Sequence, residues 1–227
     1  MNKKLVIFIG PPGSGKGTIA NLLEDNLGFK HMESSKLIEE KFEKTKPGDP
    51  DWDEVEKERE LFDAGVLTTS SFVFGLIKGK VREMSALGKS VVLSGSPRTL
   101  EEAGFELPIF IEEYGKENVH VILMDVSPEV SISRNSRRRI CEKERHPIPW
   151  TPETENITVC PEDGSNLIDR GTLDDPETIK IRLETYKKET EPILGYVEEE
   201  FGIAPVVVDG EQEVDVRFEE TKKAIGL

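Results

Sequence analysis

Short runs of apolar residues recur along the chain, and longer stretches with a helical period separate them. The runs cover residues 5–9, 91–93, 121–124 and 206–208. Because they are apolar at successive positions, they are typical of strands buried on both faces of a parallel sheet. Strands that alternate with helices predict an α/β fold with helices on both faces of the sheet. Ligands in such sheets bind beyond the carboxyl ends of the strands, so we expect the chemistry in the loops after Ile9 and Leu93.

Two long segments interrupt this alternation. The first contains three helical patterns, at 36–44, 54–62 and 71–87, with a proline-containing turn at 47–50. A helical excursion of that length predicts a mobile arm over a binding site. The second segment, residues 141–171, is rich in proline and turn-forming residues and has no helical period. A stretch of that kind is typical of either a functional lid or a disordered segment.

Two helix starts are marked by a capping residue directly before a proline. These are Ser127-Pro128 and Asp175-Pro176. The second opens a long helical pattern, in which Pro192 predicts a kink because proline removes a helical hydrogen bond.

The loop after the first apolar run carries a phosphate-binding motif. It reads G-x-x-x-x-G-K-G-T, close to the motif G-x-x-x-x-G-K-[ST], and it lies between a strand pattern and a helix pattern, which is the context that this motif needs. Glycine lets the backbone wrap an anion, Lys16 supplies a charge to the phosphates, and the hydroxyl of Thr18 can reach Mg²⁺. The residues expected to bind the nucleotide are Gly10, Pro11, Gly13, Ser14, Gly15, Lys16, Gly17 and Thr18. The alternative is an ordinary glycine-rich turn between a strand and a helix.

The composition narrows the classes of partner. The 227 residues carry a formal net charge of −15, which argues against general binding to nucleic acid or to an anionic membrane. An anionic substrate therefore needs a local cationic site. We find no membrane-spanning run and no secretory signal pattern, and two cysteines do not make a disulfide framework. These features predict a cytoplasmic protein of one domain with an insertion.

Further motifs follow the phosphate-binding loop in order. They are G-x-P-R-T at 95–99, R-x-x-x-R-R at 134–139, L-I-x-R at 167–170, D-D at 174–175 and R-L-x-x-Y at 182–186. With the loop at 10–18, this series resembles the adenylate kinases, a family of P-loop nucleoside monophosphate kinases. The resemblance covers about residues 5 to 201.

The resemblance implies one adenylate-kinase-like domain over residues 1–227. It would have the P-loop kinase fold, an acceptor-binding arm at 33–70 and a lid at 139–171. The implied reaction is reversible transfer of the γ-phosphoryl group from Mg·ATP to a nucleoside monophosphate, with AMP as the first choice. The family also leans to the monomer.

The resemblance further assigns roles to single residues. Arg134 would pack on the donor adenine. Guanidinium groups suit the remaining positions because their planar fork binds phosphate oxygens in pairs, although any one arginine alone could be a solvated surface charge. The implied catalytic cations are Lys16, Arg98, Arg138, Arg170 and Arg182. The implied acceptor-binding residues are Ser34, Gly95, Arg98 and Glu102.

Three positions depart from the family pattern. Ser94 replaces an acidic residue that organises water around Mg²⁺, and Glu39 replaces an arginine that grips the acceptor phosphate. Lys36 and Lys41 are the candidates to replace that arginine. Glu102 replaces a glutamine that reads the acceptor base, and an ionised carboxylate only accepts hydrogen bonds. Two alternatives to AMP kinase activity follow: a kinase for another monophosphate, or an ATP-binding protein with weak or lost phosphotransfer.

The lid raises the question of a metal. Family lids often hold zinc, and the corresponding residues are Cys141, Glu144, Cys160 and Asp163. His146 is another nearby candidate. The alternatives are a metal-free lid with two incidental cysteines, or a disulfide between them. His31 and His120 have no partner that the sequence reveals, which favours a core or surface role for each.

Overall fold

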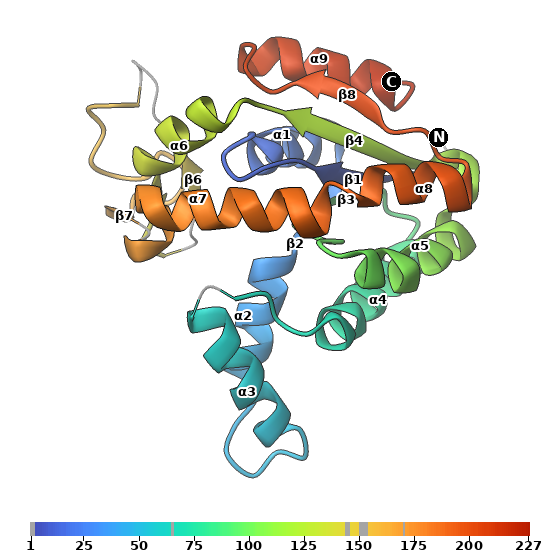
Figure 1. Cartoon of the computed structure of the whole chain (residues 1–227), viewed down its shortest axis with the longest axis horizontal. Helices are drawn as coiled ribbons and strands as arrows, with labels where there is room; N and C mark the ends of the chain where they lie inside the picture. Colours follow the sequence, from blue (N-terminus) through green and yellow to red (C-terminus); the bar gives the residue numbers. More distant parts are fainter. Residues whose placement is uncertain (1–2, 65, 144–145, 150–153, 170) are drawn as a thin grey trace.

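A five-stranded parallel sheet lies at the centre of the protein. The computed structural model describes residues 3–64, 66–143, 146–149, 154–169 and 171–227 (Figure 1). The strand order is β2-β3-β1-β4-β8, and every pairing in it is parallel. The strands are β1 (Leu5–Ile9), β2 (Lys30–Glu33), β3 (Val91–Ser94), β4 (Val119–Asp125) and β8 (Val206–Asp209).

Helices cover both faces of this sheet, as the sequence predicts. One face packs against α4 (Ser70–Ala86), α5 (Leu100–Tyr114) and α8 (Ile193–Phe201). The other face packs against α1 (Lys16–Leu27) and α9 (Val214–Ala224). Side chains of β1 alternate between the two cores, and all of them are buried. This double burial explains why the strand is apolar at every position.

The predicted arm consists of α2 (Ser34–Lys44) and α3 (Trp52–Asp63), which project from the sheet in Figure 1. The ring of Phe42 in α2 lies 5.6 Å from that of Phe62 and 6.3 Å from that of Phe72, measured between centroids. Phe72 belongs to α4, so this aromatic cluster ties the arm to the helix that returns the chain to the sheet. All three helices expected between residues 36 and 87 are confirmed.

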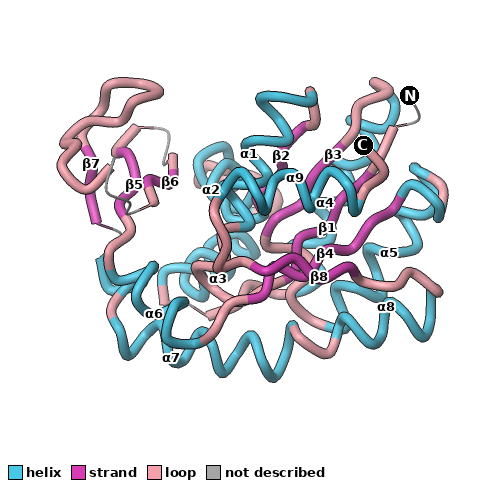
Figure 2. The backbone as a smooth tube through the Cα atoms, turned by 90° about the horizontal axis from the view of Figure 1, so that it is seen from above, coloured by secondary structure: helices cyan, strands magenta, loops and turns pink. Residues whose placement is uncertain are grey.

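The segment predicted as a lid contains a second, smaller sheet. It is antiparallel, with the order β6-β5-β7, and lies at one end of the molecule in Figure 2. Its strands are β5 (Arg139–Cys141), β6 (Pro147–Ile148) and β7 (Leu167–Asp169). The described part of this segment therefore has local structure of its own.

Helical segments flank the small sheet on both sides. They are α6 (Pro128–Ser136) before it, and the short helix η2 (Gly171–Asp174), α7 (Pro176–Thr185) and the π-helical turn η3 (Tyr186–Thr190) after it. Another short helix, η1 (Lys116–Asn118), lies between α5 and β4. Ser127 caps α6, since its hydroxyl accepts a hydrogen bond from Val130 N at 3.4 Å. The kink expected at Pro192 is confirmed, because the π turn and this proline separate α7 from α8.

The four strands expected from apolar runs are confirmed, and β2 is the strand of the central sheet that the pattern missed. Its sequence is Lys-His-Met-Glu, and only Met32 is buried. As the edge strand it needs little apolar surface, so periodicity gives no signal there. Among the described helices, none has both the length and the apolar character needed to cross a membrane.

Candidate active site

The phosphate-binding loop joins β1 to α1, and its backbone requires glycine at two positions. Gly13 (φ +73°) and Gly15 (φ +89°) both have left-handed backbone conformations. A Cβ atom on Gly13 would collide with the side-chain amide of Asn135, and one on Gly15 with the guanidinium of Arg217. Side chains from other parts of the chain therefore pack closely against the loop. Thr18 follows in the first turn of α1.

Lys16 lies inside this loop. Its Nζ donates hydrogen bonds to Gly10 O at 2.7 Å, to Pro11 O at 2.8 Å and to Ser14 Oγ at 3.2 Å. The ammonium group thus occupies the concave side of the loop, where backbone oxygens hold it in place. A phosphate entering the loop would meet this charge directly.

Three arginines from separate segments act on the same ammonium group. Burial, followed by the positive charges of Arg98, Arg182 and Arg138, lowers the pKa of Lys16 to about 7. Glu33 acts in the opposite direction but does not balance them. Positive charges therefore converge on the loop, and an anion bound among them would favour the protonated lysine again.

Asp174 orients two of these arginines. Its carboxylate accepts two hydrogen bonds from Arg138, from Nη2 at 2.5 Å and from Nε at 3.1 Å. Arg182 Nη1 lies 3.5 Å from Asp174 Oδ1, the oxygen that accepts the hydrogen bond from Arg138 Nη2. Asp174 is buried. One carboxylate thus brings together guanidinium groups from the end of α6 and from α7.

Arg134, the residue expected on the donor adenine, links α6 to the loop after β8. Its Nη1 donates to Gly210 O at 2.7 Å and to Gly13 O at 3.5 Å. Gly13 belongs to the phosphate-binding loop, so Arg134 lies beside the expected donor site.

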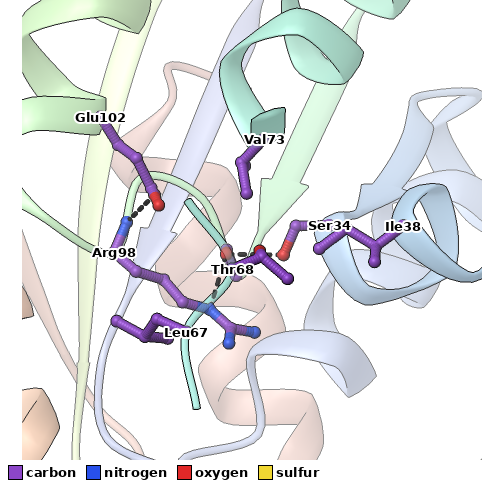
Figure 3. A pocket seen from close by; sticks show the side chains of 8 residues that line it. Ser34, Ile38, Leu67, Thr68, Val73, Arg98 and Glu102 are labelled. Carbon is purple, nitrogen blue, oxygen red and sulfur yellow. Dashed lines mark hydrogen bonds between the residues drawn. The ribbon is translucent and has the colours of Figure 1, made fainter. Parts of the chain in front are cut away.

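The residues expected to bind the acceptor line a pocket between the arm and the sheet (Figure 3). Ser34 Oγ donates to Gly95 O at 2.6 Å, and Arg98 Nε donates to the same oxygen at 2.8 Å. This carbonyl group thus fixes a hydroxyl from α2 and a guanidinium from the loop after β3. The lining residues are Ser34, Ile38, Leu67, Thr68, Val73, Gly95, Arg98 and Glu102.

Glu102 has a local structural role in this pocket. Its Oε2 accepts a hydrogen bond from Arg98 N at 2.5 Å, while its own backbone N–H donates to Thr99 Oγ1 at 3.1 Å. This reciprocal arrangement caps the start of α5. Burial raises the pKa of Glu102. Glu106 is buried one turn further along and accepts a hydrogen bond from Ser96 Oγ at 2.6 Å.

His31 has two polar partners that the sequence does not reveal. The ring bridges two side chains, with Nδ1 at 2.7 Å from Asn21 Oδ1 and Nε2 at 2.7 Å from Ser94 Oγ. Ser94 lies at the carboxyl end of β3, in register with Phe8 of β1 and Glu33 of β2. The serine at the position of the family's acidic residue is therefore held by a histidine. No sequence signal links residues so far apart in the chain.

The described residues of the lid contain a cluster suited to a metal ion. Cys141 Sγ lies 3.4 Å from His146 Nδ1 and 3.3 Å from Asp163 Oδ2, and Cys160 Sγ lies 3.5 Å from the same imidazole nitrogen. Both thiols are free, so the structure does not contain the disulfide considered as an alternative. Glu144, one of the expected ligands, lies outside the described residues. His146 takes part in the cluster in addition to the three expected residues that are described.

Two other residues named from the sequence are Arg170 and Lys41. Arg170, the fifth expected catalytic cation, also lies outside the described residues. Lys41, a candidate to replace the arginine lost at Glu39, forms an ion pair with Asp51 within the arm.

Comparison with known proteins agrees with this geometry. The family model for adenylate kinase matches residues 8–201. The adenylate kinase of Petrotoga mobilis is 32% identical over 215 residues, which cover 92% of both chains. That of Methanosarcina acetivorans is 32% identical over 220 residues, which cover 96% of both chains. That of Caldanaerobacter subterraneus subsp. tengcongensis is 32% identical over 97% of this chain and 95% of its own. The chain therefore belongs to the adenylate kinase family and is a phosphotransferase of the nucleoside monophosphate kinase type.

Proposed function

We propose that the protein transfers the γ-phosphoryl group of Mg·ATP reversibly to AMP, so that ATP and AMP give two ADP. The observation that carries this proposal is the group of cations at the phosphate-binding loop: Asp174 holds Arg138 and Arg182 together, and these two and Arg98 lower the pKa of Lys16. Arg98 also lines the pocket between arm and sheet, so one guanidinium group faces both Lys16 and the residues expected to bind the acceptor.

The chain's own residues have to position phosphates and neutralise charge. An oxygen of the acceptor phosphate forms a bond to the γ-phosphorus while the bond to the oxygen that bridges to the β-phosphorus breaks, and ADP leaves with that oxygen. No covalent intermediate with the protein is needed. Lys16 would hold the β- and γ-phosphates, and Arg138 and Arg182 would face the transferring group. Arg170 joins this set by resemblance alone.

Mg²⁺ enters as part of the substrate, and the hydroxyl of Thr18 is the group proposed to bind it. Ser94 offers no charge, and its hydroxyl is engaged with His31. Glu33, the register neighbour of Ser94, supplies a carboxylate at the same edge of the sheet and is near enough to raise the pKa of Lys16. The loss of the acidic residue at position 94 is thus partly offset on the next strand.

Recognition of the acceptor base depends on the protonation of Glu102, which stands where the family pattern has a glutamine. A protonated carboxyl group has one donor and one acceptor, as the amide of glutamine does, and this pair fits the edge of adenine. Burial favours that form because it raises the pKa of Glu102. An ionised Glu102 would instead favour a base edge rich in N–H donors, which is the observation behind a second candidate function, a kinase for such a monophosphate.

One assay separates these readings. The protein is incubated with Mg·ATP and, in turn, AMP, GMP, CMP and UMP, and diphosphate formation is followed. The expected result is fastest turnover with AMP. A preference for another acceptor would contradict the AMP assignment. If the protein binds ATP but forms no diphosphate with any of the four acceptors, the kinase proposal is contradicted.

The lid cluster is proposed to hold a structural Zn²⁺ ion. Two thiols, an imidazole and a carboxylate are all zinc ligands, and the four candidate atoms lie within 4.8 Å of one another. The holding residues would be Cys141, His146, Cys160 and Asp163, and the ion would join β5 to the turn before β7. Glu162 Oε2 lies 3.3 Å from His146 Nε2, where it can orient the ring. Metal analysis of protein purified without chelator should give about one zinc per chain, whereas a value near zero would contradict this proposal.

A further inference from the structure

Arg217, in the C-terminal helix α9, is a buried cation with unused hydrogen-bond donors. Its side chain belongs to a residue that is only 6% exposed. Among the described residues, Nε and Nη1 of its guanidinium have no hydrogen-bond partner. Thr221, one turn further along the same helix, is fully buried, and its hydroxyl likewise lacks a partner within the described chain. Polar groups at such positions are normally paired, so this face of α9 is unusual.

The guanidinium of Arg217 lies against the phosphate-binding loop. A Cβ atom on Gly15 would collide with Arg217 Nη1, so this nitrogen lies directly beside the last glycine before Lys16. Gly15 is also the residue that precedes the first turn of α1. The α1 and α9 helices pack together on this face of the sheet. Arg217 therefore reaches the donor site from a part of the chain outside the family match at 8–201.

The charges around Arg217 do not neutralise it. Burial comes first and the positive charge of Arg134 second among the effects that lower the pKa of Arg217, while Glu213 and Asp209 act in the opposite direction. Neither acidic side chain forms an ion pair with Arg217 in the described structure, and Arg134 donates to Gly210 O and Gly13 O. Two guanidinium groups thus lie on the same side of the loop. An uncompensated buried cation is costly, and an anionic ligand would remove that cost.

We infer that Arg217 binds the triphosphate of the donor nucleotide, with its free Nε–H and Nη1–H groups donating to phosphate oxygens beside Gly15. This inference rests on the proposed function, since it takes ATP as the ligand of the loop. It assigns a donor-binding role to a residue that no motif in the sequence marks. The planar fork of a guanidinium can donate two parallel hydrogen bonds to a phosphate group.

The test compares Arg217→Met with Lys222→Met in the full-length protein. Lys222 is a matched control because it is a cation on the same helix, paired with Glu219 at 2.6 Å and lying over the ring of Phe218. Calorimetry measures the dissociation constants of ATP and of inorganic triphosphate. Arg217→Met should weaken both on the order of tenfold to a hundredfold, as the loss of charge-assisted hydrogen bonds requires, and Lys222→Met should weaken neither.

Thermal unfolding supplies a second readout. Without nucleotide, Arg217→Met should be at least as stable as the wild type, because it removes an uncompensated buried charge. With saturating ATP its stabilisation should be smaller than that of the wild type. Arg217→Lys keeps the charge without the fork and should bind ATP with intermediate affinity.

Three results would overturn the inference. They are unchanged ATP affinity in Arg217→Met, weakened ATP binding with unchanged binding of inorganic triphosphate, or a loss of stability without nucleotide in both Arg217 variants. Failure of the proposed function looks different, because the wild type itself would then not bind ATP or not transfer phosphate.

Discussion

The donor and acceptor sides of the proposed site differ in how closely their residues follow the family pattern. On the donor side, the loop from Gly10 to Thr18 keeps the glycines and the lysine of its motif, and steric contacts explain the need for glycine at Gly13 and Gly15. On the acceptor side, Glu39 and Glu102 depart from the family pattern, while the pocket that contains Glu102 is still formed. A phosphate tail is bound by backbone N–H groups and positive charge, which leaves little freedom in the residues of the loop. Base recognition needs only a donor and acceptor pair, which different side chains can supply.

The largest expected effect is on the donor side. Lys16→Met removes the charge at the centre of the loop, and kcat/KM should fall by about a thousandfold or more. Lys180→Met is the matched control, since Lys180 is an exposed lysine paired with Glu177 on α7. Steady-state kinetics measures both variants, with circular dichroism to check folding. An Lys16→Met enzyme within tenfold of the wild type would contradict the role given to this loop.

The next effect concerns the residue that joins two arginines. Asp174→Asn keeps the shape of the side chain but loses its charge, so Arg138 and Arg182 should be less well oriented. We expect kcat to fall about tenfold to a hundredfold, with a smaller change in the KM for ATP. Asp175→Asn is the control, because this neighbour makes no side-chain capping bond. Equal kinetics in the two variants would show that Asp174 does not organise the arginines.

On the acceptor side we expect a pH effect of several-fold. The pKa of Glu102 is raised by burial, and the protonated form is the one that pairs with adenine. The KM for AMP should therefore rise as the pH increases through that raised pKa, in a scan that begins near the ordinary pKa of a glutamate. Glu102→Gln should have a low KM that does not change across this range. Glu101→Gln removes a charge that raises the pKa of Glu102, so it should keep the pH dependence with its inflection at a lower pH. Identical pH profiles in all three proteins would exclude Glu102 from base recognition.

The smallest expected effect is the uptake of a proton when ATP binds. Lys16 has a pKa of about 7 in the free protein, so at about pH 8.5 its amine is mostly neutral. Binding of the polyanion should raise this pKa, and the complex should take up close to one proton per ATP. Calorimetry in two buffers with different ionisation enthalpies measures this uptake, and Lys16→Met should show less. Wild-type binding without any uptake would contradict the charge assigned to the loop.

The elements that the sequence predicts are those that leave a local pattern along the chain, and the elements that it misses leave none. The strand β1, the loop after it and α1 form one continuous segment, and each leaves a local pattern. The edge strand β2 escaped because Lys30, His31 and Glu33 give it no apolar period. The three strands of the lid escaped because each has at most three residues, which is too short for any periodicity.

Candidate residues follow the same rule. Motif positions such as Arg98 and Arg138 could be named from sequence because a resemblance marks them. The hydrogen bonds between distant elements could not be predicted from the sequence. Ser94 and His31 are 63 positions apart, and Asp174 lies 36 positions after Arg138. Arg217 is harder still, because a single arginine in a C-terminal helix has no sequence signature. The role proposed for Arg217 depends on its position beside Gly15, which only the structure shows.

The most direct test of the central claim is the stoichiometry of products, followed by phosphorus NMR in a mixture of Mg·ATP and AMP. Transfer between two nucleotides held by Lys16, Arg98, Arg138 and Arg182 predicts that ADP appears at two equivalents for each ATP consumed, without inorganic phosphate. Release of inorganic phosphate in step with ATP loss, with AMP unchanged, would contradict the account.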